Sequence, residues 1–121
     1  MKHEAINLEE KFTRITEYYQ PKIIAQMNDY HFKLAKLKGD FVWHTHPETD
    51  EAFIIMDGEL EIELQDGKVT LRKGELFVVP KGVEHKPFAR EECCVMLLEP
   101  VGTLNTGDVG GEKTVADPEW I

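Results

Sequence analysis

Short stretches of alternating polar and apolar residues, separated by glycine-containing turns, constrain the fold of this chain most strongly. The clearest is Glu59 to Leu64, in which glutamate alternates with leucine or isoleucine. Because side chains of a strand alternate between its faces, this pattern predicts a strand with one face in the core and one in water. Asp57-Gly58 precedes it and Asp66-Gly67 follows it, and both dipeptides favour hairpins. Similar strands and turns recur about every eight to ten residues, which predicts an all-β fold, a small antiparallel barrel or jelly roll, over about residues 20 to 100.

Two histidines separated by one residue, His44 and His46, precede one of these apolar stretches. On a strand such a pair projects to one face, so the two imidazoles are expected side by side. Glu51 follows five residues later, and Pro47, which lacks a backbone donor, helps to end the strand. His85 comes just after a turn that contains proline and glycine. Three imidazoles and one carboxylate suit a first-row transition metal with open coordination positions.

These residues lie in two motifs that resemble those of the cupins. The first motif is matched by Gly39-x4-His44-x-His46-x4-Glu51-x6-Gly58, and the second by Gly74-x5-Pro80-x-Gly82-x2-His85. The resemblance implies a cupin jelly roll, or double-stranded β-helix, in which His44, His46, Glu51 and His85 hold the metal. Two positions depart from the usual pattern. The gap from Gly39 to His44 is one residue shorter, and Ala89 stands where asparagine is frequent, but neither departure affects a ligand.

The donor set leaves both the metal and the function open. Mn, Fe, Ni, Co, Cu and Zn are all candidates, and three imidazoles with one carboxylate on an octahedral ion leave two positions free. The chain is therefore expected to be an enzyme that acts on a small oxygenated organic molecule, or a non-catalytic binding or sensing module with a metal-held ligand. Dioxygenase, decarboxylase and isomerase reactions all occur among the proteins that it resembles.

Strand parity predicts which side chains near the expected metal point into the cavity and which point away from it. Phe53 and Ile55 share the parity of Glu51 and are predicted to line the cavity, whereas Trp43 is predicted to point out of it. An acid or base near the metal would favour catalysis over binding. Three carboxylates close to the ligands, Glu48, Asp50 and Glu84, are expected to face solvent instead, and Glu48 is the best of these candidates.

The chain of 121 residues is expected to form one domain, residues 1–121. Asn7 can cap a helix predicted over about residues 7–18, which packs on the barrel or contacts a second subunit. The last segment, about residues 99–121, is rich in glycine but carries apolar anchors, so it is expected to wrap the barrel or cover its mouth.

Charge and composition limit the partners that the chain can have. Lys and Arg number 14 and Asp and Glu 23, so the net charge of −9 disfavours nucleic acid and anionic membranes. No apolar run of about 18 residues could span a bilayer. The start, Met1 to Glu4, lacks the apolar part of a signal peptide, so a cytoplasmic location is expected.

Two adjacent cysteines, Cys93 and Cys94, lie in an apolar run that continues to Leu98. On a strand they face opposite ways, which predicts free thiols rather than a bridge. A strand that is apolar on both faces must be covered on both sides, by another sheet or by a second subunit. We therefore expect a homodimer, as the cupin resemblance also implies.

Overall fold

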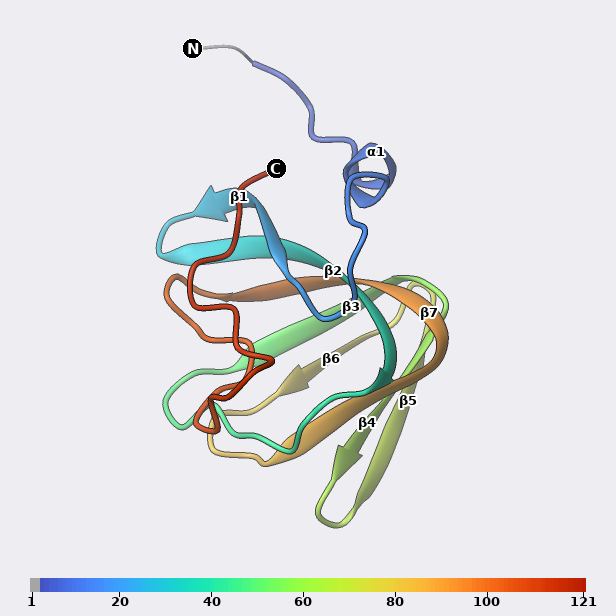
Figure 1. Ribbon diagram of the computed structural model, residues 1–121, viewed down its shortest axis with the longest axis vertical. Helices are drawn as coiled ribbons and strands as arrows, with labels where there is room; N and C mark the ends of the chain where they lie inside the picture. The colour runs from blue at the N-terminus through green and yellow to red at the C-terminus, as the bar shows by residue number, and fades with distance from the viewer. Residues whose placement is uncertain (1–2) are drawn as a thin grey trace.

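A computed structural model describes residues 3–121, whose strands form a barrel with one short helix outside it (Figure 1). The elements are α1 Leu8–Phe12, β1 Lys22–Met27, β2 Tyr30–Asp40, β3 Glu51–Asp57, β4 Glu59–Leu64, β5 Gly67–Arg72, β6 Leu76–Val79 and β7 His85–Pro100. The seven strands belong to one sheet in the order β1-β2-β7-β3-β6, with β4 paired to β7 and β5. All strand pairs are antiparallel. The all-β jelly-roll prediction is thus confirmed.

The long last strand, β7, joins the two parts of the sheet. Its first residues pair with β4, from His85 opposite Leu64, and its later residues pair with both β2 and β3. Only residues 93–98 were predicted as strand, so the observed element is much longer. A strand this long curves around the barrel, and His85 at its start and Glu99 next to its last residue are both buried.

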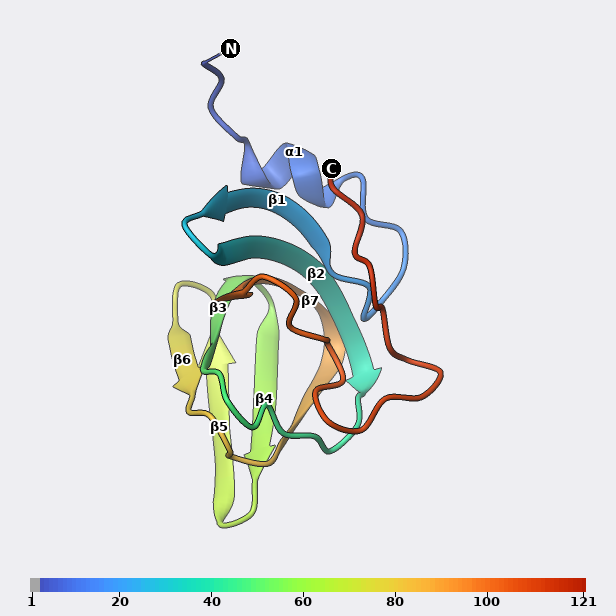
Figure 2. The same cartoon turned by 90° about the vertical axis from the view of Figure 1, so that its left-hand side faces the viewer.

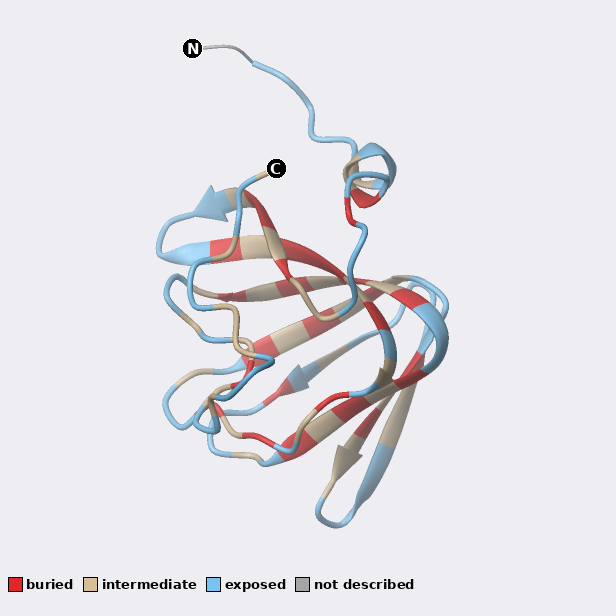
Figure 3. Ribbon diagram, viewed as in Figure 1, coloured by how far each residue is buried: buried red, intermediate tan, exposed pale blue. Residues whose placement is uncertain are grey.

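The barrel interior is filled by the inward-facing residue of each alternating pair. Figure 3 shows buried residues alternating with more exposed ones along the strands. The main core cluster contains Leu60 and Ile62 of β4, Phe53 and Ile55 of β3, and residues of β2, β5, β6 and β7. The alternation predicted for the stretch from Glu59 to Leu64 therefore places its apolar residues as expected.

A second cluster covers the outer face of the sheet beneath α1. Phe12 and Ile15 pack against Ile24 and Leu34 there. The helix begins as predicted, because the Asn7 side chain accepts a hydrogen bond from the Glu10 amide at 2.9 Å. It ends at Phe12, however, and the prediction of a helix to about residue 18 was wrong. The Thr13 hydroxyl donates to the Glu10 carbonyl, and the following β-branched residues disfavour further turns.

The two motif histidines lie on a loop and not on the predicted strand. β2 ends at Asp40, and residues 41–50 contain only an isolated bridge between His44 and His85, with mutual N···O distances of 3.0 and 2.9 Å. Pro87 and Pro47, which cannot donate to a ladder, flank this bridge and keep it from lengthening. Trp43 is directed outward and is among the exposed large apolar residues.

The segment after β7 runs back across the barrel to β1 (Figure 2). Asp108 donates a backbone hydrogen bond to Thr45, and Ile23 exchanges backbone hydrogen bonds with Glu119 and Ile121. The C-terminal end of the chain therefore lies beside β1. Within residues 3–121, no helix has the length and apolar character that crossing a membrane requires. Met1 and Lys2, where the expected absence of a signal peptide was argued, lie outside the described residues.

Candidate metal centre

Four side chains that the sequence singled out converge inside the barrel. His44 and His46 come from the loop, Glu51 begins β3 and His85 begins β7. One potential ligand atom from each lies within 4.8 Å of the others, and each residue is at most 5% exposed. Glu51 Oε1 lies 3.2 Å from His46 Nε2 and 3.4 Å from His85 Nε2. The structure thus brings together three nitrogen donors and one carboxylate.

The backbone orients two of the imidazoles. His44 Nδ1 lies 2.9 Å from the Val42 carbonyl, and His85 Nδ1 lies 2.9 Å from the Val83 carbonyl. Because a carbonyl can only accept, each Nδ1 donates its proton, and each Nε2 keeps a free lone pair. This arrangement of ring nitrogens is typical of histidines that bind metals.

Three buried atoms at this point have no hydrogen-bond partner among the described residues. They are His46 Nε2, His85 Nε2 and Glu51 Oε1. Buried polar atoms are almost always satisfied, so three such atoms facing one another need a common partner. A divalent transition metal would satisfy all three, and the donor set of three imidazoles and one carboxylate suits such an ion.

The electrostatics of the cluster keep its donors in forms that can bind a cation. Burial lowers the pKa of His44 from 6.5 to about 4, so its imidazole is neutral at pH 7. Burial alone would raise the pKa of Glu51, but His46, His85 and Glu99 outweigh it and hold that pKa below its usual range. A neutral imidazole and an ionised carboxylate are the states that ligate metals.

Comparison with known proteins agrees with the fold and the motifs. The family model described as Cupin domain matches residues 30–99. The chain belongs to the cupin family. A crystal structure of a cupin-2 domain containing protein from Shewanella frigidimarina is 54% identical, covers 78% of this chain and 93% of its own, and has a TM-score of 0.78. The crystal structure of protein NMB1881 from Neisseria meningitidis is 40% identical and has a TM-score of 0.74. The match covers 80% of this chain and 99% of NMB1881.

A curated relative also matches this cupin over part of its length. The uncharacterized protein YdbB of Bacillus subtilis is 38% identical over 64 residues. The match covers 52% of this chain and 57% of YdbB, so it spans little more than half of that relative.

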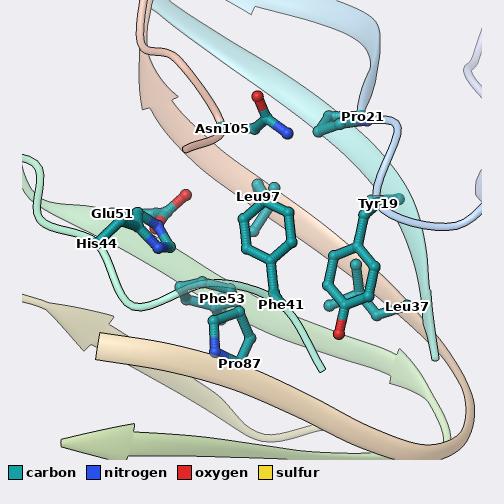
Figure 4. Close-up of a pocket in the computed structure, with 11 residues that line it drawn as sticks. Tyr19, Pro21, Leu37, Phe41, His44, Glu51, Phe53, Pro87, Leu97 and Asn105 are labelled. Carbon is teal, nitrogen blue, oxygen red and sulfur yellow. The ribbon is translucent and has the colours of Figure 1, made fainter. Parts of the chain in front are cut away.

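A cavity extends from the candidate metal centre into the cupin barrel (Figure 4). It runs from His44 and Glu51 at one end to Tyr19 at the other. The remaining lining residues are Pro21, Ala35, Leu37, Phe41, Phe53, Pro87, Leu97 and Asn105. Phe53 lines the cavity. Ile55 shares its face of β3 but lies beyond the cavity, fully buried in the core cluster.

Several cavity residues were not identified from the sequence. Tyr19 and Phe41 stack with ring centroids 4.6 Å apart, and the Tyr19 hydroxyl donates to the Gly39 carbonyl. Asn105 reaches the cavity from the last segment, where its side chain bonds to the backbone of Lys113 and Val115. These residues come from segments distant in sequence, and no local pattern marks them.

The loop carboxylates that could act as acid or base lie outside this cavity. Glu48 borders a separate, open hollow beside His46, formed with residues 100–104. Asp50 accepts a hydrogen bond from the Lys81 amide at 2.8 Å, and Glu84 is exposed. All three carboxylates are exposed, and the cavity is lined mainly by apolar side chains.

A buried ion pair close to Glu51 was also missed. Lys33 Nζ lies 2.9 Å from Glu99 Oε1, and the two side chains are 2% and 1% exposed. Burial and the negative charge of Glu51 raise the pKa of Glu99, while Lys33 opposes this shift. A signal did exist, because Lys33 shares the parity of inward-facing Ala35 and Leu37, and Glu99 that of Val95 and Leu97.

Proposed function

We propose that this cupin binds one divalent transition metal through His44, His46, Glu51 and His85 and uses it to hold a small oxygen-bearing organic molecule. The observation that carries the proposal is the set of three buried, unpartnered donor atoms facing one another. Leaving such atoms unsatisfied costs about 1–3 kcal/mol each, so an ion that engages all of them stabilises the fold as well as the site.

The cavity supports a small ligand with an apolar body and an oxygen donor at one end. Its wall is mostly apolar, and its polar side chains are the candidate ligands His44 and Glu51 together with Tyr19 and Asn105. The cavity volume is about 30 Å³, which limits the ligand to a few heavy atoms unless side chains move. Apolar side chains such as Phe41, Phe53 and Leu97 would exclude bulk water from a ligand held there.

We favour an enzyme of the dioxygenase, decarboxylase or isomerase type. A bound transition metal supplies Lewis acidity toward an oxygen-bearing molecule or, if it is redox-active, activation of dioxygen. Apart from His44 and Glu51, the cavity residues within the described part of the chain include no carboxylate or imidazole. A cavity without a further acid or base also suits a non-catalytic binding or sensing module, which is the alternative function.

Elemental analysis of the purified protein tests the metal proposal. We expect near-stoichiometric metal in the wild type and its loss in His46→Ala and His85→Ala, because each variant removes one donor. His31→Ala is the matched control, since His31 is also buried but packs edge-on against Trp120, outside the cluster. Iron would direct the next step to oxygen-uptake screening, whereas manganese, nickel or zinc would favour isomerase, decarboxylase or binding roles. A wild type that holds no metal even after reconstitution would overturn the proposal in favour of a metal-free binding barrel.

We also propose that the protein works in the cytoplasm. Cys93 and Cys94 are both free, and they lie on opposite faces of β7. Burial raises the pKa of the Cys93 thiol to about 12, so this thiol is protonated at neutral pH. Two unbridged cysteines are in keeping with a reducing compartment.

A homodimer is the proposed assembly, formed through β6 and the sheet face beside it. Leu76 and Val78 of β6 are 61% and 44% exposed, and among the strands of residues 3–121 β6 pairs with β3 alone. The strand register continues this apolar surface from Leu76 to Ile54 and Met96, and from Val78 to Ala52 and Leu98. An edge strand can pair antiparallel with its own copy about a two-fold axis, so a second copy of the chain suits this surface.

A further inference from the structure

The pair of Lys33 and Glu99 is a costly feature to place inside a barrel. Both side chains are almost completely buried, and Lys33 Nζ also lies 3.3 Å from the Thr103 carbonyl. Replacing a buried ion pair by apolar residues of similar size is often neutral or stabilising. Stability alone is therefore a poor explanation for two charges at this position.

The sheet register brings Glu99 to the metal ligand Glu51. Ala52 of β3 pairs with Leu98 of β7, so Glu51 and Glu99, one residue further on each strand, are cross-strand neighbours. Both side chains are buried in the barrel interior, on neighbouring strands. Lys33 approaches the same point from β2, on the other side of β7.

Only one oxygen of Glu99 has a hydrogen-bond partner in the described part of the chain. Oε1 accepts from Lys33, whereas Oε2 is buried without a hydrogen-bond partner among residues 3–121. The other buried side-chain atoms in that condition are the three donors of the candidate metal centre. Glu99 is not among the residues that line the cavity. It can reach a bound ligand only through Glu51.

We infer that Glu99, anchored by Lys33, is a positioning residue that orients the Glu51 carboxylate so that its Oε1 faces the three histidines. This inference rests on the proposed metal function. Partners of metal ligands typically change metal affinity by about 10–100-fold when they are lost, because the ligand then adopts other orientations.

Titration of chelator-treated protein with Co²⁺ tests this role, because visible absorption reports both affinity and coordination geometry. The double variant K33M/E99L removes both charges together and leaves no unpaired buried ion. We expect it to fold, to bind Co²⁺ about 10–100-fold more weakly than the wild type and to show an altered spectrum. K33M/E99Q keeps a side chain of the same shape beside Glu51 without the buried charges, and we expect it to recover most of the affinity.

A matched control uses the ion pair between Lys86 of β7 and Asp40 of β2, which lies nearer the surface. Lys86 Nζ is 3.0 Å from Asp40 Oδ1. K86M/D40L should bind Co²⁺ like the wild type. Should K33M/E99L fail to fold, Glu99→Asp decides the question, because it keeps a partner for Lys33 but withdraws from Glu51. A folded K33M/E99L or Glu99→Asp protein with wild-type affinity and spectrum would overturn the inference alone. A wild type that binds no Co²⁺ would overturn the metal proposal and this inference together.

Discussion

At the scale of single residues, burial determines how His44 responds to pH. Its pKa is about 4 in the folded protein against 6.5 as an ordinary histidine. Between these values the unfolded chain binds more protons than the folded one, so stability falls as the pH is lowered through this range. The full effect is about 3 kcal/mol. Chemical denaturation of chelator-treated protein at pH 7 and pH 4.5 should show this loss.

The His44→Asn variant separates this effect from other titrations. The raised pKa of Glu99 works in the opposite direction, because there the folded state binds the additional proton as the pH falls. The stability of the wild type relative to His44→Asn should therefore fall as the pH is lowered from 7 to 4.5. A difference that is independent of pH would contradict the depressed pKa of His44.

The candidate ligands could be predicted from sequence, but the residues behind them could not. His44, His46 and Glu51 lie within one short motif, so local spacing was enough to find them. The contact between Glu51 and Glu99 depends on how β3 and β7 are aligned, which no local pattern encodes. Parity placed Phe53 and Ile55 on the same face, but it could not show that the cavity ends before Ile55.

At the scale of elements, the segment after β7 holds the loop that carries the histidines. Thr45, between His44 and His46, accepts a hydrogen bond from the Asp108 amide at 3.0 Å and donates one to Asp108 Oδ1 at 2.9 Å. Gly107 makes this approach possible, because a Cβ there would lie 2.2 Å from the Thr45 carbonyl oxygen. We expect Gly107→Ala to push the loop away, destabilise the protein by about 1–3 kcal/mol and weaken metal binding.

Gly110→Ala provides a closely matched control for that substitution. Both glycines have positive φ, +56° at Gly107 and +69° at Gly110, but a Cβ at Gly110 meets nothing within 4 Å. The two variants thus share the backbone strain and differ in the clash. Thermal unfolding and Co²⁺ titration should show a clear loss in Gly107→Ala beyond that in Gly110→Ala. Equal losses would mean that the contact with Thr45 is unimportant.

Hairpins were the elements most accessible from sequence, and elements with distant partners the least. Asp57-Gly58 correctly indicated the turn between β3 and β4, because Gly58 adopts a φ of +86° that few other residues tolerate. The stretch from Phe41 to His46 has strand-like residues but no continuous partner, so it forms a loop. β7 was underestimated for the opposite reason, since its polar first half is extended by pairing with β4 and β2.

At the scale of the whole molecule, net charge and apolar surface act in opposite directions on assembly. Each chain carries −9, so two copies repel each other, and this repulsion weakens as salt is added. The apolar face at β6 supplies the attraction, and it is continuous with the sheet face that α1 covers further along. We therefore expect dimerisation to strengthen with ionic strength.

Val78→Lys tests the dimer proposed through β6. In an isologous interface each substitution occurs twice about the two-fold axis, so one change buries two unpaired ammonium groups. Light scattering coupled to size-exclusion chromatography should give about 28 kDa for the wild type, twice the chain mass of 13.9 kDa, and 13.9 kDa for Val78→Lys. Val109→Lys places the same charge at another exposed valine, in the last segment, and should stay dimeric. A monomeric wild type, or a dimeric Val78→Lys protein, would show that β6 is not the interface, and its exposed apolar residues would then need another explanation.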